Sequence, residues 1–273
     1  VRRLSAREVV LRKKVDFATA SFPSALRALT VIAAFSVFLI LNGCAGVNKE
    51  LTGKKDAGQL YDNGTLSYQG QKYEEAERHF KTLMQDFPLS RYAVEAQLNL
   101  GDVYYAMERY DDANSYYTNF AALHPKHPEA DYALFQKGMC HFKDVLSVDR
   151  DQTPARKAIF AFQDLISARP DSEYAPKARE LIVFLMNRLA EREFYVARFY
   201  FNGKNYKGAL GRLRDLLKSY PDSALTATAL YYIGESYTMI GEKKLASDAF
   251  GALIGGFPDS PYAGDARKRL NEG

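Results

Sequence analysis

The stretch LGDVYYAMERYDDANSYYTNFAALHP, residues 100–125, recurs in outline as IGESYTMIGEKKLASDAFGALIGGFP at residues 233–258. Each copy places a glycine ahead of a polar turn, followed by an alanine, an aromatic residue and a closing proline. The alanines Ala76 and Ala113, like Ala209 and Ala246, are 37 residues apart. A short unit that cannot bury its own apolar face stacks on copies of itself. The sequence therefore predicts a repeat array, whose long concave surface suits protein binding better than chemistry.

Five units follow this plan along the chain. Their closing prolines are Pro88, Pro125, Pro170, Pro221 and Pro258, the small residues of their first helices are Gly64, Gly101, Gly138, Ala197 and Gly234, and the alanines of their second helices are Ala76, Ala113, Ala158, Ala209 and Ala246. A proline ends a helix because it lacks an N–H and disfavours helical angles in its predecessor. The serine two residues after four of the prolines is expected to cap the next helix, and Pro128 to lie in a first turn.

The glycine, tyrosine, alanine, aromatic and proline positions resemble the tetratricopeptide repeat, with a 37-residue period in place of about 34. The predicted fold is therefore all-α, a right-handed α-solenoid of five tetratricopeptide-like helix pairs. Generic helical hairpins with coincidental prolines are the alternative. Two insertions interrupt the period, and we expect them to form a longer turn at Leu146–Thr153 and a longer helix through Ala178–Arg198.

The front of the chain differs in charge from the rest. Residues 1–43 hold seven Lys and Arg against two acidic residues, which leaves 30 basic and 31 acidic residues beyond them, a net charge of −1. That balance removes the electrostatic case for a nucleic-acid partner. The apolar run Val31–Leu41 is too short for a helix that spans a bilayer and matches the core of a secretory signal.

The run ends in Leu-Asn-Gly-Cys at residues 41–44, which resembles the lipobox of bacterial lipoproteins. The resemblance implies a signal peptide at 1–43, lipidation of Cys44, and a flexible lipidated tether at 44–59. A retained signal anchor and an ordinary cleaved secretory signal are the alternatives. With Cys44 lipidated, Cys140 has no partner for a disulfide and is expected to be a small buried side chain.

The repeats fall into two predicted groups. Residues 60–170 hold units one to three, and residues 171–273 hold the long linking helix, units four and five, and a terminal capping helix. The first helices of the first group carry apolar side chains at positions expected to face a groove: Tyr61, Tyr68, Leu98, Tyr105, Tyr132, Phe135 and Phe142. Such a groove suits an extended segment that ends in an aromatic residue. The alternative is that these side chains pack between repeats.

Several segments go beyond a generic repeat: His124–Pro128, Asp131–Ala133, Val148–Asp151 leading into Ala158–Phe162, Arg188–Ala190, Glu193–Tyr195, and Ala197 with Tyr200. With the lipobox, they resemble the BamD family of lipoproteins of the outer-membrane β-barrel assembly machinery, from Cys44 to about Leu270. The resemblance implies a scaffold that is lipid-anchored in the outer membrane and faces the periplasm. It also implies a groove for targeting segments of unfolded outer-membrane proteins in the N-terminal repeats.

The same resemblance implies the protein partners. These are the barrel-forming subunit of the machinery, held through its periplasmic domain by the C-terminal repeats, and accessory assembly lipoproteins. Arg212 matches an arginine of the family that contacts the barrel-forming subunit; the alternative is a solvated surface charge.

The sequence carries no motif for catalysis. It has no glycine-rich phosphate loop, no Gly-x-Ser-x-Gly and no Cys-x-x-Cys. His124 and His127 lack an obvious third metal ligand. We therefore expect no enzyme activity, no cofactor, no metal and no nucleic acid. Two rival functions stay open: an envelope lipoprotein that organises peptidoglycan synthesis or cell division, and a repeat domain that regulates an enzyme or has weak hydrolase activity.

Overall fold

The computed structural model describes residues 56–145 and 150–272. Within these residues the chain forms eleven helices and no strand. The helices are α2 (Ala57–Gln69), α3 (Tyr73–Asp86), α4 (Arg91–Ala106), α5 (Tyr110–Leu123), α6 (Ala130–Lys143), α7 (Thr153–Ala168), α8 (Ala175–Asn202), α9 (Tyr206–Ser219), α10 (Thr226–Met239), α11 (Lys243–Gly256) and α12 (Ala263–Glu272). They form five successive pairs, α2–α3 to α10–α11, with α12 after the last pair. This confirms the predicted solenoid of tetratricopeptide-like helix pairs.

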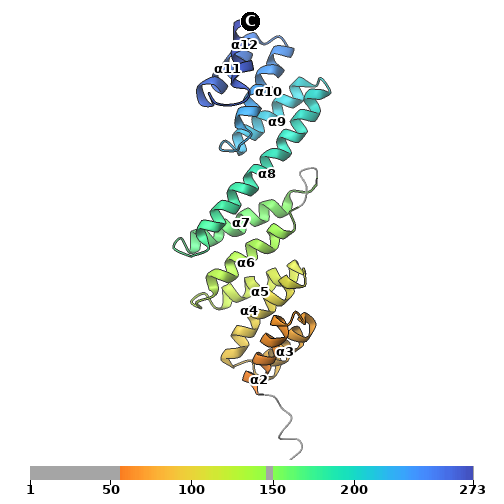
Figure 1. The fold of residues 1–273 in the computed structure, drawn as a ribbon, viewed down its shortest axis with the longest axis vertical. Coiled ribbons are helices and arrows are strands. Elements are labelled where there is room, and N and C mark those ends of the chain that lie inside the picture. The colour runs from red at the N-terminus through yellow and green to blue at the C-terminus, as the bar shows by residue number, and fades with distance from the viewer. Residues whose placement is uncertain (1–55, 146–149, 273) are drawn as a thin grey trace, which may run out of the picture. The chain divides into compact units, whose positions relative to one another are not determined.

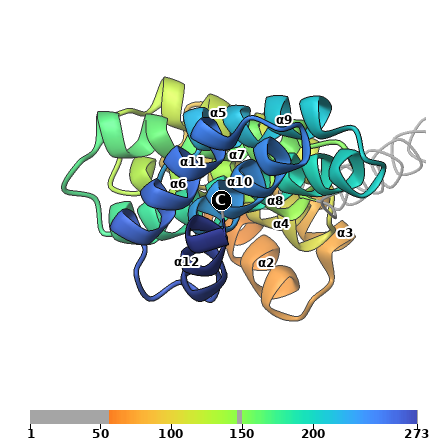
Figure 2. The same cartoon turned by 90° about the horizontal axis from the view of Figure 1, so that it is seen from above.

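Each helix packs mainly on its neighbours in the chain, so the helices stack in sequence order (Figure 1). Figure 2 looks along the same stack from its C-terminal end, with α11 and α12 nearest the viewer. Among the described residues, no helix combines the length and the apolar character that a bilayer crossing requires. The predicted signal peptide and Cys44 lie outside the described residues.

The prolines end the second helices as predicted. Helices α3, α5, α7, α9 and α11 each end two residues before a closing proline, as Asp86 does before Pro88. The serine two residues after the proline accepts a hydrogen bond from the backbone N–H two positions on, at 3.2–3.3 Å, in all four units that have it. Only Ser90 is itself the N-cap, of α4. In the other three units the hydroxyl orders the turn just before the helix.

The third pair uses a histidine where the others use serine. His127 stands two residues after Pro125, and its Nδ1 accepts a hydrogen bond from the N–H of Glu129 at 3.2 Å. Helix α6 begins at Ala130, with Glu129 as N-cap. Pro128 therefore lies in the turn ahead of the helix, and its expected place in the first helical turn is wrong.

The small residue of each first helix lies against a ring of the paired second helix. A Cβ added to Gly64, Gly101, Gly138 or Gly234 would lie 2.4–2.6 Å from the ring of Phe80, Tyr117, Phe162 or Phe250, respectively. Real Cβ atoms do not approach so closely, so an alanine at any of these positions would force the ring or the helix to shift. The fourth pair solves the same problem differently, since Ala197 is matched by Leu213 in the same buried cluster. The smaller leucine leaves room for the alanine methyl group.

The structure describes the second predicted insertion fully and the first only in part, because residues 146–149 lie outside the described residues. Thr153 is the first residue of α7, so the helix begins at the residue expected to close the longer turn. Helix α8 is 28 residues long and includes the whole of Ala178–Arg198. Its Leu181, Leu185 and Leu189 are buried.

The buried side chains form three clusters along the stack. The first spans α2 to α6, the second α6 to α8, and the third α8 to α12. Helix α8 belongs to two clusters, since Leu189 lies in the second and Ala190 in the third. Tyr220 packs against both of these clusters. Cys140 is 1% exposed in the first cluster, which confirms the predicted buried thiol.

Candidate functional site

The predicted groove side chains lie on the first helices of three pairs, α2, α4 and α6. Six of the seven are half-buried or exposed. Leu98 differs, because it is only 4% exposed and lies within the first buried cluster. Its side chain therefore serves the core and offers almost no surface to a ligand, which corrects its expected place in the groove.

Tyr61 and Tyr68 present aromatic surface on α2. The Tyr61 ring lies 5.4 Å from Tyr92 and 6.0 Å from Phe80, measured between centroids. Its hydroxyl accepts a hydrogen bond from Asn99 at 3.3 Å. Tyr68 is 36% exposed and its ring lies 5.8 Å from Tyr73.

Tyr132 and Phe135 share a neighbour that the sequence did not suggest. Tyr174, just before α8, stacks on Phe135 at 5.2 Å and lies 6.0 Å from Tyr132. The three rings form a half-buried aromatic surface between α6 and α8. Aromatic surface of this kind gains stacking energy with an incoming aromatic side chain.

Tyr105 and Phe142 lie toward the C-terminal ends of their helices. Tyr105 meets Tyr110 edge-on at 5.3 Å, and burial raises the pKa of Tyr105 to about 12. Phe142 lies 5.8 Å from Phe184 of α8. The structure thus brings the predicted residues together with second-helix and next-repeat aromatics, so part of each ring packs between repeats and part stays open.

Asp102 is a site residue that the sequence did not reveal. Its Oδ1 accepts hydrogen bonds from the hydroxyls of Tyr117 and Tyr132, both at 2.7 Å. Burial raises the pKa of Asp102 above its usual range, although the two tyrosine hydrogen bonds act in the opposite sense. The charge of Asp102 in turn contributes to the raised pKa of Tyr68, after burial. A partly buried carboxylate therefore lies among three tyrosines from α2, α5 and α6.

Arg212 projects from α9 at the other end of the stack. Its Nη1 donates to Glu193 Oε2 of α8 at 3.3 Å, and 45% of its side chain is exposed. An exposed pair of this kind contributes little to stability, about 0–1 kcal/mol. Arg212 is thus placed at the surface with a guanidinium that an external carboxylate could engage.

The paired histidines serve the turn before α6. His124 Nε2 lies 3.3 Å from Gln97 Oε1, and His127 Nε2 lies 3.3 Å from Glu95 Oε1. Both rings pack on Phe120. Across the described part of the chain, no cluster of three or more His, Cys, Asp or Glu side chains is arranged to hold a metal ion.

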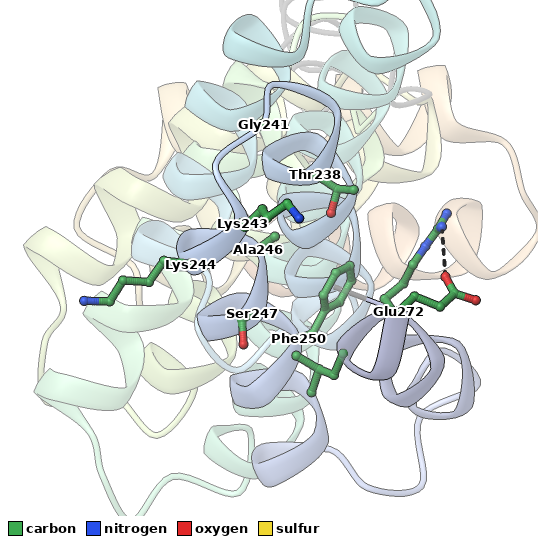
Figure 3. A pocket seen from close by; sticks show the side chains of 10 residues that line it. Thr238, Gly241, Lys243, Lys244, Ala246, Ser247, Phe250 and Glu272 are labelled. Carbon is green, nitrogen blue, oxygen red and sulfur yellow. Dashed lines mark ion pairs between the residues drawn. The ribbon is translucent and has the colours of Figure 1, made fainter.

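A pocket of about 500 Å³ lies beside the last helix pair (Figure 3). Phe250 and Leu270 form part of its wall, and Lys243, Ser247 and Arg269 are among its polar lining. Phe250 and Ser247 correspond to Phe80 and Glu77 of the first unit. In that unit Tyr104 of the following helix donates a hydrogen bond to Glu77 at 2.8 Å.

The chain is similar to proteins named "Outer membrane protein assembly factor BamD". The protein from Caulobacter vibrioides is 29% identical over 90% of this chain and 82% of the relative. That from Neisseria meningitidis serogroup A is 30% identical over 85% of this chain and 92% of the relative. Among solved structures, the "TPR2AB-domain:pHSP90-complex of yeast Sti1" is 15% identical and covers 78% of this chain and 81% of that chain, with a TM-score of 0.45.

A family model described as "Outer membrane lipoprotein", YfiO, matches residues 53–251, which include the first four helix pairs and most of the fifth. The match thus covers the half-buried aromatics of α2, α4 and α6 together with Arg212 of α9. The chain belongs to the YfiO family of outer membrane lipoproteins.

Proposed function

We propose that this protein is a non-catalytic scaffold of the β-barrel assembly machinery, lipid-anchored in the outer membrane and facing the periplasm. The observation that carries the proposal is the half-buried aromatic surface on α2, α4 and α6 of this chain. The chain itself belongs to a family of outer membrane lipoproteins. The similar proteins named as outer membrane protein assembly factors support the same role. The scaffold binds unfolded outer-membrane proteins and the barrel-forming subunit, together with accessory assembly lipoproteins.

The N-terminal repeats, residues 60–170, bind the client, which is an unfolded outer-membrane protein. An extended segment with a terminal aromatic residue lies against Tyr61, Tyr68, Tyr105, Tyr132, Phe135 and Phe142. Leu98 supports these side chains from the core. Because the rings already pack against neighbours, they are held in place before the client arrives, which lowers the entropy that binding must offset.

The C-terminal region, residues 171–273, takes the periplasmic domain of the barrel-forming subunit. Arg212 is the proposed contact, and an acidic side chain of the partner replaces Glu193 as its acceptor. A guanidinium suits this exchange because it forms bidentate bonds with carboxylates. Cys44 carries the lipid, and the tether at 44–59 joins it to the repeats.

Depletion with complementation tests the function as a whole. When the protein is depleted from its host, folded barrels in the outer membrane should fall, measured by their resistance to unfolding in unheated gels. Unchanged barrel levels, or co-purification with cell-wall enzymes in place of barrel subunits, would contradict the proposal.

Complementing variants separate the three parts of the proposal. Tyr132→Ala with Phe135→Ala should reduce client cross-linking, whereas Tyr195→Ala, an exposed tyrosine on α8, should not. Arg212→Glu should reduce capture of the barrel-forming subunit. Glu193→Gln breaks the same ion pair without reversing the charge at residue 212 and should leave capture intact. Cys44→Ser should release the protein from membranes.

A further inference from the structure

A second cavity lies between α6 and α7 and has a distinct chemistry. It measures about 480 Å³ and is lined by Lys137, His141, Arg156, Lys157, Phe160 and Ala161. Three of these six side chains, Lys137, Arg156 and Lys157, carry a positive charge, and none of the six is acidic. The chain beyond residue 43 has a net charge of −1, so a local concentration of positive charge does not follow from the overall composition.

The cavity lies on the side of α6 opposite the aromatic surface. At about 100° per residue, Lys137 and His141 are about 140° and 180° around the helix from Tyr132. Lys137 and His141 are half-buried, whereas Arg156, Lys157 and Phe160 of α7 are exposed. The cavity is therefore open to a ligand while the groove on the other face of α6 is occupied.

The positive charge of the cavity is only partly compensated. Lys137 Nζ has a carboxylate at 3.4 Å, Asp164 Oδ2, a long ion pair across the two helices. Arg156 also acts on Tyr220, since its charge lowers the pKa of that tyrosine against the larger effect of burial, which raises it. The long ion pair leaves Lys137 able to bind a further acceptor, and Lys157 adds a second ammonium group beside it.

The pKa of His141 is affected by the same positive charges. Burial lowers the pKa of His141, and Lys157 of α7 and Lys137 of α6 lower it further, whereas Asp144 and Asp111 of α5 oppose this. The side-chain amide of Asn114 on α5 lies 2.9 Å from His141 Nε2 and donates to it. Burial and the two lysines thus favour the neutral form of the imidazole over the charged form.

We propose that this cavity is a binding site for a phosphate group, held by Lys137, Lys157 and Arg156, with Phe160 as an apolar wall for the organic part of a phosphate ester. Ammonium and guanidinium groups form charge-assisted hydrogen bonds with phosphate oxygens. An exposed phenylalanine beside such donors fits an esterified phosphate, because it covers the carbon atoms next to the phosphorus. The same chemistry serves a phospholipid headgroup and a soluble phosphate.

Binding should be linked to protonation of His141. A phosphate in the cavity offsets the field of Lys137 and Lys157, so it should raise the pKa of His141. Binding at neutral pH would then take up protons at this residue. This provides a signal that a nonspecific surface contact would not give.

Lysine acetylation footprinting of the full chain tests the proposal. In detergent micelles free of phosphate, adding inorganic phosphate in place of chloride at constant ionic strength should slow acetylation of Lys137 and Lys157 several-fold, measured by mass spectrometry. Lys243 and Lys244 serve as internal controls, since they are exposed lysines in the other large pocket. NMR titration in the same two buffers should show a higher pKa for His141 with phosphate.

A vesicle arm identifies the source of the phosphate. The full chain is reconstituted in vesicles of phosphatidylcholine alone or with phosphatidylglycerol. Protection of Lys137 and Lys157 that appears with phosphatidylglycerol assigns the site to a lipid headgroup, and protection by inorganic phosphate alone assigns it to a soluble phosphate.

Three results would overturn the proposal. They are equal protection of Lys243 and Lys244, protection by a poly-glutamate peptide but by neither phosphate source, and no protection under any condition. The double variant Lys137→Gln, Lys157→Gln keeps Arg156 and its electrostatic interaction with Tyr220, so the fold is preserved while the site is lost. In this variant the response of His141 to phosphate should disappear.

Discussion

Gly234 shows how one missing Cβ sets the distance between two helices. An alanine there would place its methyl group 2.4 Å from the ring of Phe250. We expect Gly234→Ala to lower the free energy of unfolding by about 1–3 kcal/mol, because the core must shift to admit one carbon. Urea denaturation measures the change.

The fourth helix pair suggests the compensating variant. Its Ala197 is matched by Leu213, so Phe250→Leu added to Gly234→Ala should recover part of the lost stability. Double-mutant analysis then gives a favourable coupling between residues 234 and 250. If the stability losses of Gly234→Ala and Phe250→Leu simply added, the Phe250 ring would not be the reason that position 234 requires glycine.

Asp102 predicts a pH dependence at the residue scale. Its pKa is raised in the folded state by burial, so the charged form is less favourable in the folded protein than in the unfolded chain. The resulting loss of stability is present at neutral pH and disappears as pH falls below 3.8, the usual pKa of the group. Asp102→Asn should therefore raise the Tm at pH 7, and the difference from wild type should shrink toward pH 4.

Asp248→Asn is the matched control, because Asp248 is an exposed carboxylate on α11. It should change the Tm little at either pH. A Tm for Asp102→Asn that lies below wild type at pH 7 would mean that the tyrosine hydrogen bonds require the negative charge.

At the scale of the element, the turns inside four of the helix pairs share one backbone conformation. Gln71, Glu108, Lys204 and Gly241 all have positive φ, between 58° and 84°. After each of them, a backbone N–H bonds back to the carbonyl five residues earlier, as in Arg109 to Tyr104 at 2.9 Å. This pattern closes the first helix, and it favours glycine at the residue with positive φ.

Exchanging two equivalent turn residues tests this conformation. Lys204→Gly should raise the free energy of unfolding by about 1 kcal/mol, because glycine adopts positive φ without a Cβ clash. Gly241→Lys should lower it by a similar amount. A Cβ at Gly241 would meet no atom within 4 Å, so only the backbone conformation is changed. Thermal unfolding of both variants gives the comparison, and shifts of the same sign would contradict it.

The helix pairs could be predicted because their signals act locally. A proline ends a helix and a glycine admits a ring wherever they stand, so the five units followed from spacing alone. The exposure of the aromatics could not be predicted, since Leu98 and Tyr61 hold equivalent positions three residues before a glycine, yet only the larger side chain reaches the surface. Asp102 also escaped notice, because Tyr117 and Tyr132 approach it only in the folded stack.

At the scale of the whole molecule, Tyr220 connects two buried clusters that meet along α8. Its ring packs against both of these clusters. We expect Tyr220→Ala to destabilise the protein by about 1–3 kcal/mol and to separate the unfolding of α9–α12 from that of α2–α7. Hydrogen exchange followed by mass spectrometry resolves the two regions.

Tyr195→Ala is the control for this variant, because Tyr195 is exposed on α8. The substitution removes an aromatic ring but leaves the packing between the two buried clusters unchanged. It should leave the exchange of both regions close to wild type. An equal loss of protection in α2–α7 and α9–α12 in Tyr220→Ala would show that the two regions remain one cooperative unit.

The length of α8 has a geometric consequence. Ala197 lies 27 residues after Pro170, whereas Gly101 lies 13 residues after Pro88, so α8 carries an insertion of fourteen residues. Fourteen residues are close to four full turns, about 14.4 residues, so the insertion advances the chain by about 21 Å while nearly restoring the angular phase. The later repeats are thus displaced along the rod without being rotated to another side. Natural or engineered length variants of this rod should occur in whole turns, because a change of two residues would swing everything downstream through about 200°.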